Sequence, residues 1–312
     1  MEPDIRRLQN IRSLALVLTA LSFLIILVSA YIRLNGAGLG CAGWPDCYGQ
    51  LLAGTPHPHS GGVRILHRIV ASTALLLGFF LAWRCARPHP LQPVASQATV
   101  LVALMILLTF IGLWSSDAHR AWASFFNILG GATLVVLSWR LVLTAGQDAS
   151  RPKSSRAAIL QHAGLGLLAL VIALGALIGA RYAASACTSL PWCGGVSWPV
   201  DAGWAALNPF TTVVAPAAPG DDGGVALHLL HRYGALASLL LLGMAGLQAL
   251  LRPATRRAAG ALLLLLLIQF ALGVLIVLSG FSLWLAVAHS VCAAGLLMVA
   301  AQLLIQSRIG AD

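Results

Sequence analysis

Long apolar runs alternate with short polar segments along the whole chain, and this pattern predicts membrane-spanning helices. Each run holds roughly 20 residues, the length that crosses about 30 Å of hydrocarbon as an α-helix. The runs are continuously apolar, which excludes the alternating strands of a membrane barrel. We therefore predict an all-α integral membrane protein with eight transmembrane helices near residues 13–33, 64–84, 93–114, 121–143, 158–180, 225–250, 258–280 and 283–305.

The composition agrees with this prediction. Of the 312 residues, 59% are hydrophobic and only 9% are charged, whereas a soluble domain is close to one quarter charged. The formal net charge is +10, but no basic tail or stripe is present that suits nucleic acid. The lipid bilayer is the expected surrounding, and nucleic acid is excluded as a partner.

The basic residues are distributed unequally between the two sides of the predicted spans. One side carries 13 of the 19 arginine and lysine residues, and this excess marks the cytoplasmic side. Both termini are then cytoplasmic, and two long loops, about 34–63 and 181–224, lie outside. Each of these loops contains one close cysteine pair, Cys41/Cys47 and Cys187/Cys193, so we expect an oxidising compartment and one disulfide in each loop.

The two halves of the chain repeat each other. Both cysteine pairs have C-x5-C spacing and are offset by 146 positions (41 to 187), while the His-Arg pairs at 67–68 and 231–232 are offset by 164. An insertion of about 18 residues in the second outer loop explains the difference. We predict two pseudo-symmetric four-helix bundles, residues 1–143 and 158–312, joined by a cytoplasmic linker at 144–157 and related by a pseudo-two-fold axis along the membrane normal.

Three histidines lie inside the outer ends of their spans: His67, His231 and His289. An imidazole in hydrocarbon is costly unless it faces the bundle interior and has a partner. Haem iron takes two axial imidazoles from opposite sides, which makes His231 and His289 candidate iron ligands. Arg232, and Arg68 in the first half, are candidate partners for the haem propionates.

Other polar residues carry weaker signals. His57 and His59 in the first outer loop are expected to be solvated, because no carboxylate or thiolate with suitable spacing accompanies them. Asn127 stands where the second half has His289, and an amide is a poor iron ligand. The corresponding site in the first half, beside His67, would therefore hold a haem with one protein ligand and an open position on the iron, or no haem.

Several motifs together resemble bacterial haem A synthase, the cytochrome oxidase assembly enzyme. They are YIRLNGAGLGCAGWPDCYGQL, ILHR, GLWSSD, ARYAASACTSLPWCGG and HLLHRYGAL, and the likeness covers essentially the whole chain. The resemblance implies stepwise oxidation of a methyl group of haem O to a formyl group, giving haem A. It implies haem b on His231 and His289 in the C-terminal unit, and haem O as substrate in the N-terminal unit with His67 near its iron.

The resemblance also implies surroundings and partners. The expected location is the bacterial inner (plasma) membrane, with several passes, cytoplasmic termini and periplasmic cysteine loops. Haem O synthase, a farnesyltransferase, is an expected partner, and other cytochrome oxidase assembly factors are possible partners.

Two positions depart from the family pattern, both in the N-terminal unit. The family usually has a glutamate three residues before the first His-Arg pair, where this chain has Arg64, and its second N-terminal histidine is Asn127 here. Asp46 is the nearest acidic candidate for proton transfer, although a turn of the WPDC type favours Asp for backbone reasons. An alternative function is a non-catalytic haem-binding assembly protein with a degenerate N-terminal site.

Two further functional classes fit the sequence less well than a haem A synthase or a haem-binding assembly protein. A thiol–disulfide oxidoreductase would use the loop cysteines as redox groups rather than as bridges that fasten the loops. A transporter would be compatible with the internal repeat, but the chain lacks the interrupted Gly/Pro helices expected at a midplane binding site.

Overall fold

The computed structural model describes residues 2–39, 41, 43–54, 61–115, 117–146 and 156–309. Within these residues, eight helices are long and apolar enough to cross a membrane, as predicted, and no β-strand forms beyond one isolated bridge between Cys193 and Val196. The helices are α1 (Glu2–Gly36), α2 (Gly61–Ala86), α3 (Val94–Trp114), α4 (Ala121–Ala145), α5 (Arg156–Ala180), α6 (Asp222–Leu250), α7 (Arg256–Leu278) and α8 (Leu283–Ile309).

Helix starts differ from the apolar runs that predicted them. Helix α1 starts at Glu2 rather than at residue 13, because its polar first turns contain good helix formers and no glycine. Helix α6 starts at Asp222, and the side chain of Asp221 accepts a hydrogen bond from the Gly224 amide at 2.8 Å. This N-cap satisfies one of the free amides of the first turn and defines where the helix begins.

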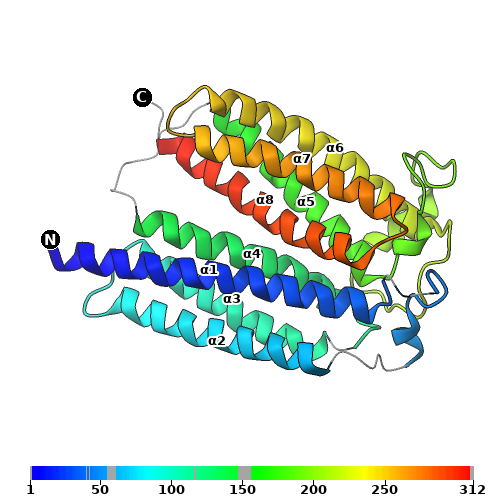
Figure 1. Cartoon of the computed structure of the whole chain (residues 1–312), viewed down its shortest axis with the longest axis horizontal. Helices are drawn as coiled ribbons and strands as arrows, with labels where there is room; N and C mark the ends of the chain where they lie inside the picture. The colour runs from blue at the N-terminus through cyan, green and yellow to red at the C-terminus, as the bar shows by residue number, and fades with distance from the viewer. Residues whose placement is uncertain are drawn as a thin grey trace.

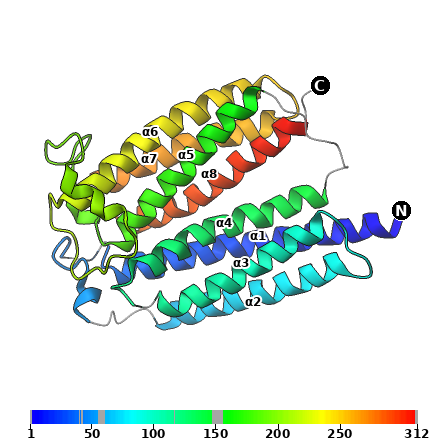
Figure 2. The ribbon, with the colours of Figure 1, turned by 180° about the vertical axis from the view of Figure 1, so that it is seen from behind.

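The helices form two groups of four (Figures 1 and 2). In the first group α1 and α3 each contact α2 and α4, and in the second group α5 and α7 each contact α6 and α8. The groups meet where α1 and α4 contact α8 and where α4 contacts α5. This arrangement is compatible with the predicted pair of four-helix bundles.

Repeat-related positions meet between the groups. Positions 33 and 179 differ by the same 146 residues that separate the cysteine pairs, and Arg33 Nη1 lies 2.6 Å from the point where a Cβ on Gly179 would stand. Equivalent positions come together only near the axis that relates two copies. The contact is therefore compatible with a pseudo-two-fold axis between the outer ends of α1 and α5.

Each group has its own apolar core, and the outward faces remain apolar. One cluster of buried side chains lies within α1–α4 and another within α5–α8. On α7, Leu264, Leu267 and Leu278 are all more than half exposed. Apolar side chains on a free helix face are what contact with lipid requires.

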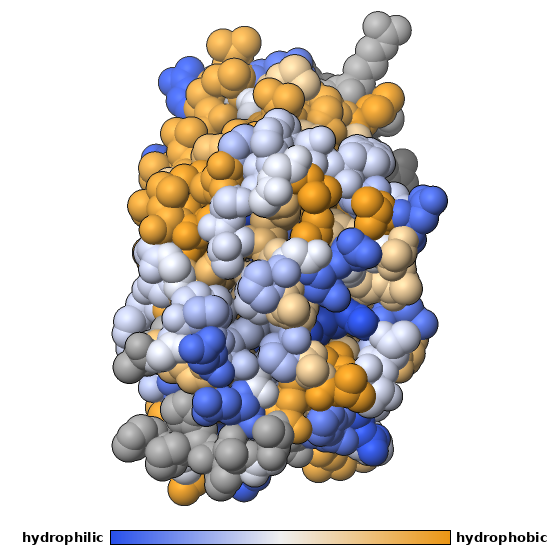
Figure 3. All heavy atoms as spheres, turned by 90° about the vertical axis from the view of Figure 1, so that its right-hand side faces the viewer, coloured by the Kyte–Doolittle hydropathy of each residue, from blue (hydrophilic) through white to orange (hydrophobic). Residues whose placement is uncertain are grey.

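The end of the molecule that carries the cysteine loops joins the two groups. Helix α1 begins and α8 ends at one end, and the cysteine-containing loops lie at the other (Figure 1). Seen from that end, hydrophilic and hydrophobic side chains are mixed, with hydrophobic surface over the C-terminal group in the upper part of the view (Figure 3). A cluster that includes Tyr48, Tyr182 and Phe281 is built from loops of both halves.

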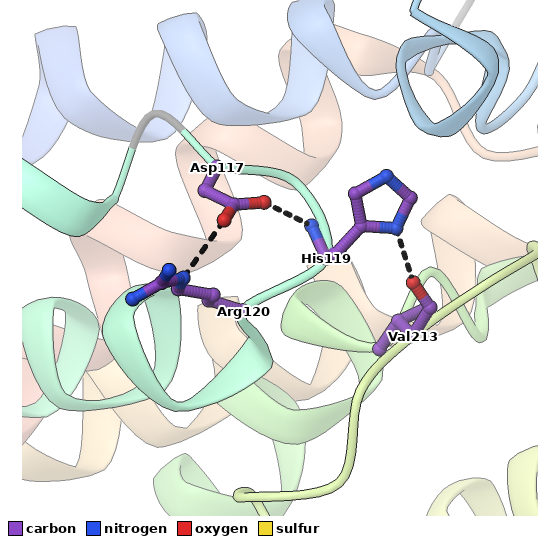
Figure 4. Close-up of polar contacts among 4 residues, drawn as sticks. All are labelled: Asp117, His119, Arg120 and Val213. Atoms are coloured by element: carbon purple, nitrogen blue, oxygen red, sulfur yellow. Dashed lines mark hydrogen bonds and ion pairs between the residues drawn. The ribbon is translucent and has the colours of Figure 1, made fainter.

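The predicted insertion in the loop at 181–224 also connects the two groups of helices. Its Val213 amide donates to the His119 carbonyl at 3.1 Å, and His119 Nδ1 donates to the Val213 carbonyl at 2.6 Å (Figure 4). His119 is held in turn by Asp117, whose carboxylate accepts from the His119 amide and from Arg120 Nε. Because His119 lies between α3 and α4, the extra residues fasten the C-terminal half onto the N-terminal half.

Candidate functional site

The imidazoles of His231 on α6 and His289 on α8 lie together inside the C-terminal group. Their ring centres are 6.3 Å apart. A metal–imidazole bond is about 2.0–2.1 Å long and the ring centre lies about 1.1 Å beyond the nitrogen, so two imidazoles on opposite sides of one ion have centres about 6.3 Å apart. The spacing therefore suits axial ligation of a single metal ion.

The neighbouring helix α5 holds the His231 ring. His231 Nδ1 donates to the Val171 carbonyl at 2.9 Å, which leaves Nε2 as the nitrogen that can bind a metal. Gly175, one turn further along α5, provides the space: a Cβ at this position would lie 3.0 Å from His231 Cε1. A side chain at position 175 would therefore crowd the ring and shift it by a few tenths of an ångström.

Helix α7 provides the corresponding surroundings of His289. The amide nitrogen of Gln269 lies 3.1 Å from His289 Nε2. Gly273, one turn further along α7, faces the same ring, and a Cβ there would lie 3.4 Å from His289 Cε1. Each histidine of the pair thus has a glycine on the adjacent helix.

The chemistry of this donor set fits a haem better than a bare metal ion. Among the described residues, no group of three or more His, Cys, Asp or Glu side chains can hold a metal, and a bare zinc ion takes three or four protein ligands. Haem iron needs only two axial ligands, because the porphyrin supplies the others.

Three buried polar atoms around the pair lack a hydrogen-bond partner in the described part of the chain: Arg232 Nη2, Gln269 Oε1 and His289 Nδ1. Unpaired buried polar atoms are costly, and a bound group can satisfy them. The free guanidinium nitrogen of Arg232 is suited to a haem propionate, and its Nη1 already donates to the Pro191 carbonyl at 3.0 Å.

The sequence analysis overlooked His228. It lies on α6 one turn before His231, is 6% exposed, and its Nε2 lies 3.0 Å from the Ala183 carbonyl. The sequence does contain a signal for this residue, because His228 and His231 are three positions apart and therefore share one face of a helix. By the 164-residue offset His228 is the counterpart of Arg64, so the two halves differ at this position as well.

The N-terminal half places the corresponding residues on α2 and α4. These helices stand at opposite corners of their group, as α6 and α8 do. His67 and Asn127 are both half-buried, whereas Arg64 and Arg68 are exposed. The remaining predicted candidates are peripheral: Asp46 is exposed, and His57 and His59 lie outside the described residues.

Both predicted disulfides are present, Cys41–Cys47 and Cys187–Cys193. The second closes a loop that packs on α6, where Arg232 reaches the Pro191 carbonyl and lies 3.9 Å from Cys193 Sγ. The aromatic ring of Tyr233 stacks on Trp198 with centres 6.0 Å apart. The loop is thereby fixed beside the candidate ligand His231.

The first cysteine loop packs across the boundary between the halves. The Tyr48 hydroxyl accepts from the Ala184 amide at 3.4 Å, and burial raises the pKa of Tyr48 above its ordinary value. Gly49 adopts φ +76°, and a Cβ there would lie 2.8 Å from Pro216. Only glycine fits this approach between the two outer loops.

Comparisons with known proteins identify similar sequences. A family model described as "Cytochrome oxidase assembly protein" (COX15-CtaA) matches residues 12–61 and 66–301. A heme A synthase of Shewanella oneidensis is 31% identical over 315 residues, covering 89% of this chain and 90% of the relative. A heme A synthase of Shouchella clausii is 29% identical over 242 residues, 72% of each chain.

A third relative carries a different name. A protoheme IX farnesyltransferase of Thermus thermophilus is 28% identical over 278 residues, and this alignment covers 85% of the present chain and 43% of that protein. Arg64 lies in the short segment, residues 62–65, between the two stretches that match the family model.

Proposed function

The chain belongs to the COX15-CtaA family of cytochrome oxidase assembly proteins, and from this membership we propose that it is a haem A synthase. It oxidises a methyl group of haem O to a formyl group and provides haem A for cytochrome oxidase. Two relatives named heme A synthase, aligned over 89% and 72% of this chain, support the assignment. It is a multi-pass membrane protein, and by the distribution of its basic residues its termini are cytoplasmic and its cysteine loops periplasmic, in the bacterial inner membrane.

The structural observation that supports a haem b site is the 6.3 Å spacing of His231 and His289. These two residues would hold haem b, with Arg232 as the partner of a propionate. Bound there, haem b would supply one-electron transfer. The residues of this chain orient it: Val171 and Gly175 position one imidazole, and the helices around them exclude water.

The N-terminal group is the proposed substrate site, with haem O near His67 and with Arg68 available to a propionate. If water supplies the oxygen atom, converting the methyl group to a formyl group releases four electrons and four protons, and the electrons leave through an electron carrier of the membrane. His67 would be the imidazole of this half near the iron of haem O. Haem O synthase, as the source of the substrate, is a proposed partner.

A second function is favoured by one specific observation. Arg64 and Asn127 occupy the two positions where the family usually has a glutamate and a histidine, and Arg64 is exposed. A protein that keeps only the C-terminal haem site would be a non-catalytic haem-binding factor in cytochrome oxidase assembly.

Extraction of haems from cells separates the two functions. The chain is expressed together with a haem O synthase in a host that makes no haem A, and the extracted haems are resolved by chromatography. A haem A synthase produces a haem A peak, which disappears in the His67→Ala variant. Accumulation of haem O alone, with the C-terminal haem spectrum retained, identifies the non-catalytic protein.

A further inference from the structure

Gln269 is the only polar side chain of α7 between Arg257 and Ser279. A polar amide in the middle of a helix that faces lipid and protein is costly unless it has a partner. The partner in the structure is His289, whose Nε2 lies 3.1 Å from the Gln269 amide nitrogen. The position of this amide therefore points toward the histidine pair.

The two residues in contact each retain one unused buried atom. Gln269 Oε1 and His289 Nδ1 lack hydrogen-bond partners among the described residues. Oε1 is an acceptor, and Nδ1 of a neutral imidazole can carry the proton. A metal bound at Nε2 would take the place of the 3.1 Å contact with the Gln269 amide. If the two side chains then turned so that Nδ1–H reached Oε1, both unused atoms would be paired.

His231 already has this arrangement. Its Nδ1 donates to the Val171 carbonyl at 2.9 Å, and its Nε2 is left for a metal. Metal-binding histidines commonly hold their second nitrogen in this way, which selects the tautomer and raises the basicity of the ligating nitrogen. The acceptor for His231 is a backbone carbonyl, so His289 is the ligand whose acceptor is a side chain.

The internal repeat indicates that the Gln269 amide is not required for helix packing alone. At the offsets of 162 to 164 that relate the two halves, the counterparts of Gln269 are Leu107, Ile106 and Met105, all apolar. The counterpart of His289 at the offset of 162 is Asn127. The half that lacks the second histidine thus also lacks the amide.

We propose that Gln269 is the positioning residue of His289, accepting the Nδ1 proton through Oε1 and thereby setting the basicity of Nε2 toward the haem iron. The inference rests on the proposed haem site. A more basic axial ligand favours ferric over ferrous iron, so Gln269 also tunes the midpoint potential of the haem.

The test uses the full chain in nanodiscs, reconstituted with haem b, and compares Gln269→Leu with Gln269→Glu. Leucine removes the acceptor, so the midpoint potential rises and haem is lost to an apo-acceptor protein roughly 10- to 100-fold faster. Glutamate is a stronger acceptor, so the potential falls. Opposite shifts from two variants of similar size are not expected from a packing defect.

Gln161→Leu is the matched control. Gln161 is also a half-paired amide of the C-terminal group: its Nε2 donates to Ser307 Oγ at 2.9 Å and its Oε1 lacks a partner in the described residues. It lies at the cytoplasmic end of α5, remote from His289, and its substitution leaves the potential unchanged.

Two results would overturn the inference. Wild-type potential and haem retention in both Gln269 variants would show that the amide does not act on His289, and shifts of the same sign in both would show a general packing effect. If the wild-type chain lacks a bis-imidazole spectrum, it is the proposed haem site that fails, and the two failures are thereby distinguished.

Discussion

The ring centres of His231 and His289 lie 6.3 Å apart, although 58 positions separate the two residues in the chain. The spacing results from α6 and α8 standing at opposite corners of one four-helix group, each held by α5 and α7. This separation matches that of two imidazoles bound to one metal ion. The following predictions test what this pair and its surroundings do.

Replacing either member of the pair would remove one of the two proposed iron ligands. His231→Ala and His289→Ala should each abolish the low-spin bis-imidazole absorption spectrum of the purified protein. His119→Ala, which alters a histidine of the outer turn between α3 and α4, should leave the spectrum intact. A normal low-spin spectrum in both His231→Ala and His289→Ala would refute the ligand assignment.

Filling the space at Gly175 should displace His231. The Cβ of Gly175→Ala would lie 3.0 Å from His231 Cε1, a contact so close that the ring must shift by a few tenths of an ångström. We expect lower haem content per chain, measured by the pyridine haemochrome assay. Gly166→Ala on the same helix meets no atom within 4 Å and should bind haem as the wild type does.

His67 should be required for the reaction but not for the C-terminal haem. Because His67 lies on α2, in the other helix group, His67→Ala should stop haem A formation in cells that supply haem O. The bis-imidazole spectrum of the same purified variant should be unchanged. Loss of the spectrum in this variant would contradict the separation of the two sites.

The loop disulfides should act as structural bridges. Cys187→Ser frees a short loop whose closure contributes about 2 kcal/mol in chain-entropy terms, and it loosens the loop that Arg232 contacts. We expect a lower thermal unfolding midpoint and faster haem loss, with haem A formation reduced but present. Complete loss of activity at wild-type thermal stability would favour the thiol–disulfide oxidoreductase.

Alkaline pH should loosen the contact between the outer loops and the C-terminal half through Tyr48. Burial raises the pKa of this phenol in the folded protein, so the folded state holds the proton more tightly than the unfolded state. The associated stability is complete below the ordinary tyrosine pKa of about 10 and is lost as the pH rises above it.

The measurement compares thermal unfolding midpoints at pH 8 and pH 11 for the wild type and Tyr48→Phe. The variant should show a smaller drop between the two pH values, because phenylalanine cannot ionise. An equal drop in both proteins would show that other groups dominate the alkaline transition.

Hydropathy alone located the eight helices, because spanning a membrane needs a long apolar run and little else. The repeat offsets also selected His231, His289 and Arg232, since polar residues at matching depths in two copies are rare in apolar helices. The spacing of the cysteines within outer loops was sufficient to predict both disulfides. These features are local in the chain, or repeat at a constant interval along it.

Tertiary structure decided which helix faces meet. In a membrane both the lipid-facing and the protein-facing sides of a helix are apolar, so the pattern along α7 does not reveal that Gln269 reaches His289. The contact of His228 with the Ala183 carbonyl, and the use of the inserted loop to join His119 to Val213, likewise depend on how the helices and loops pack. The candidate residues could be predicted from the sequence, whereas their distances and hydrogen-bond partners depend on how the helices pack.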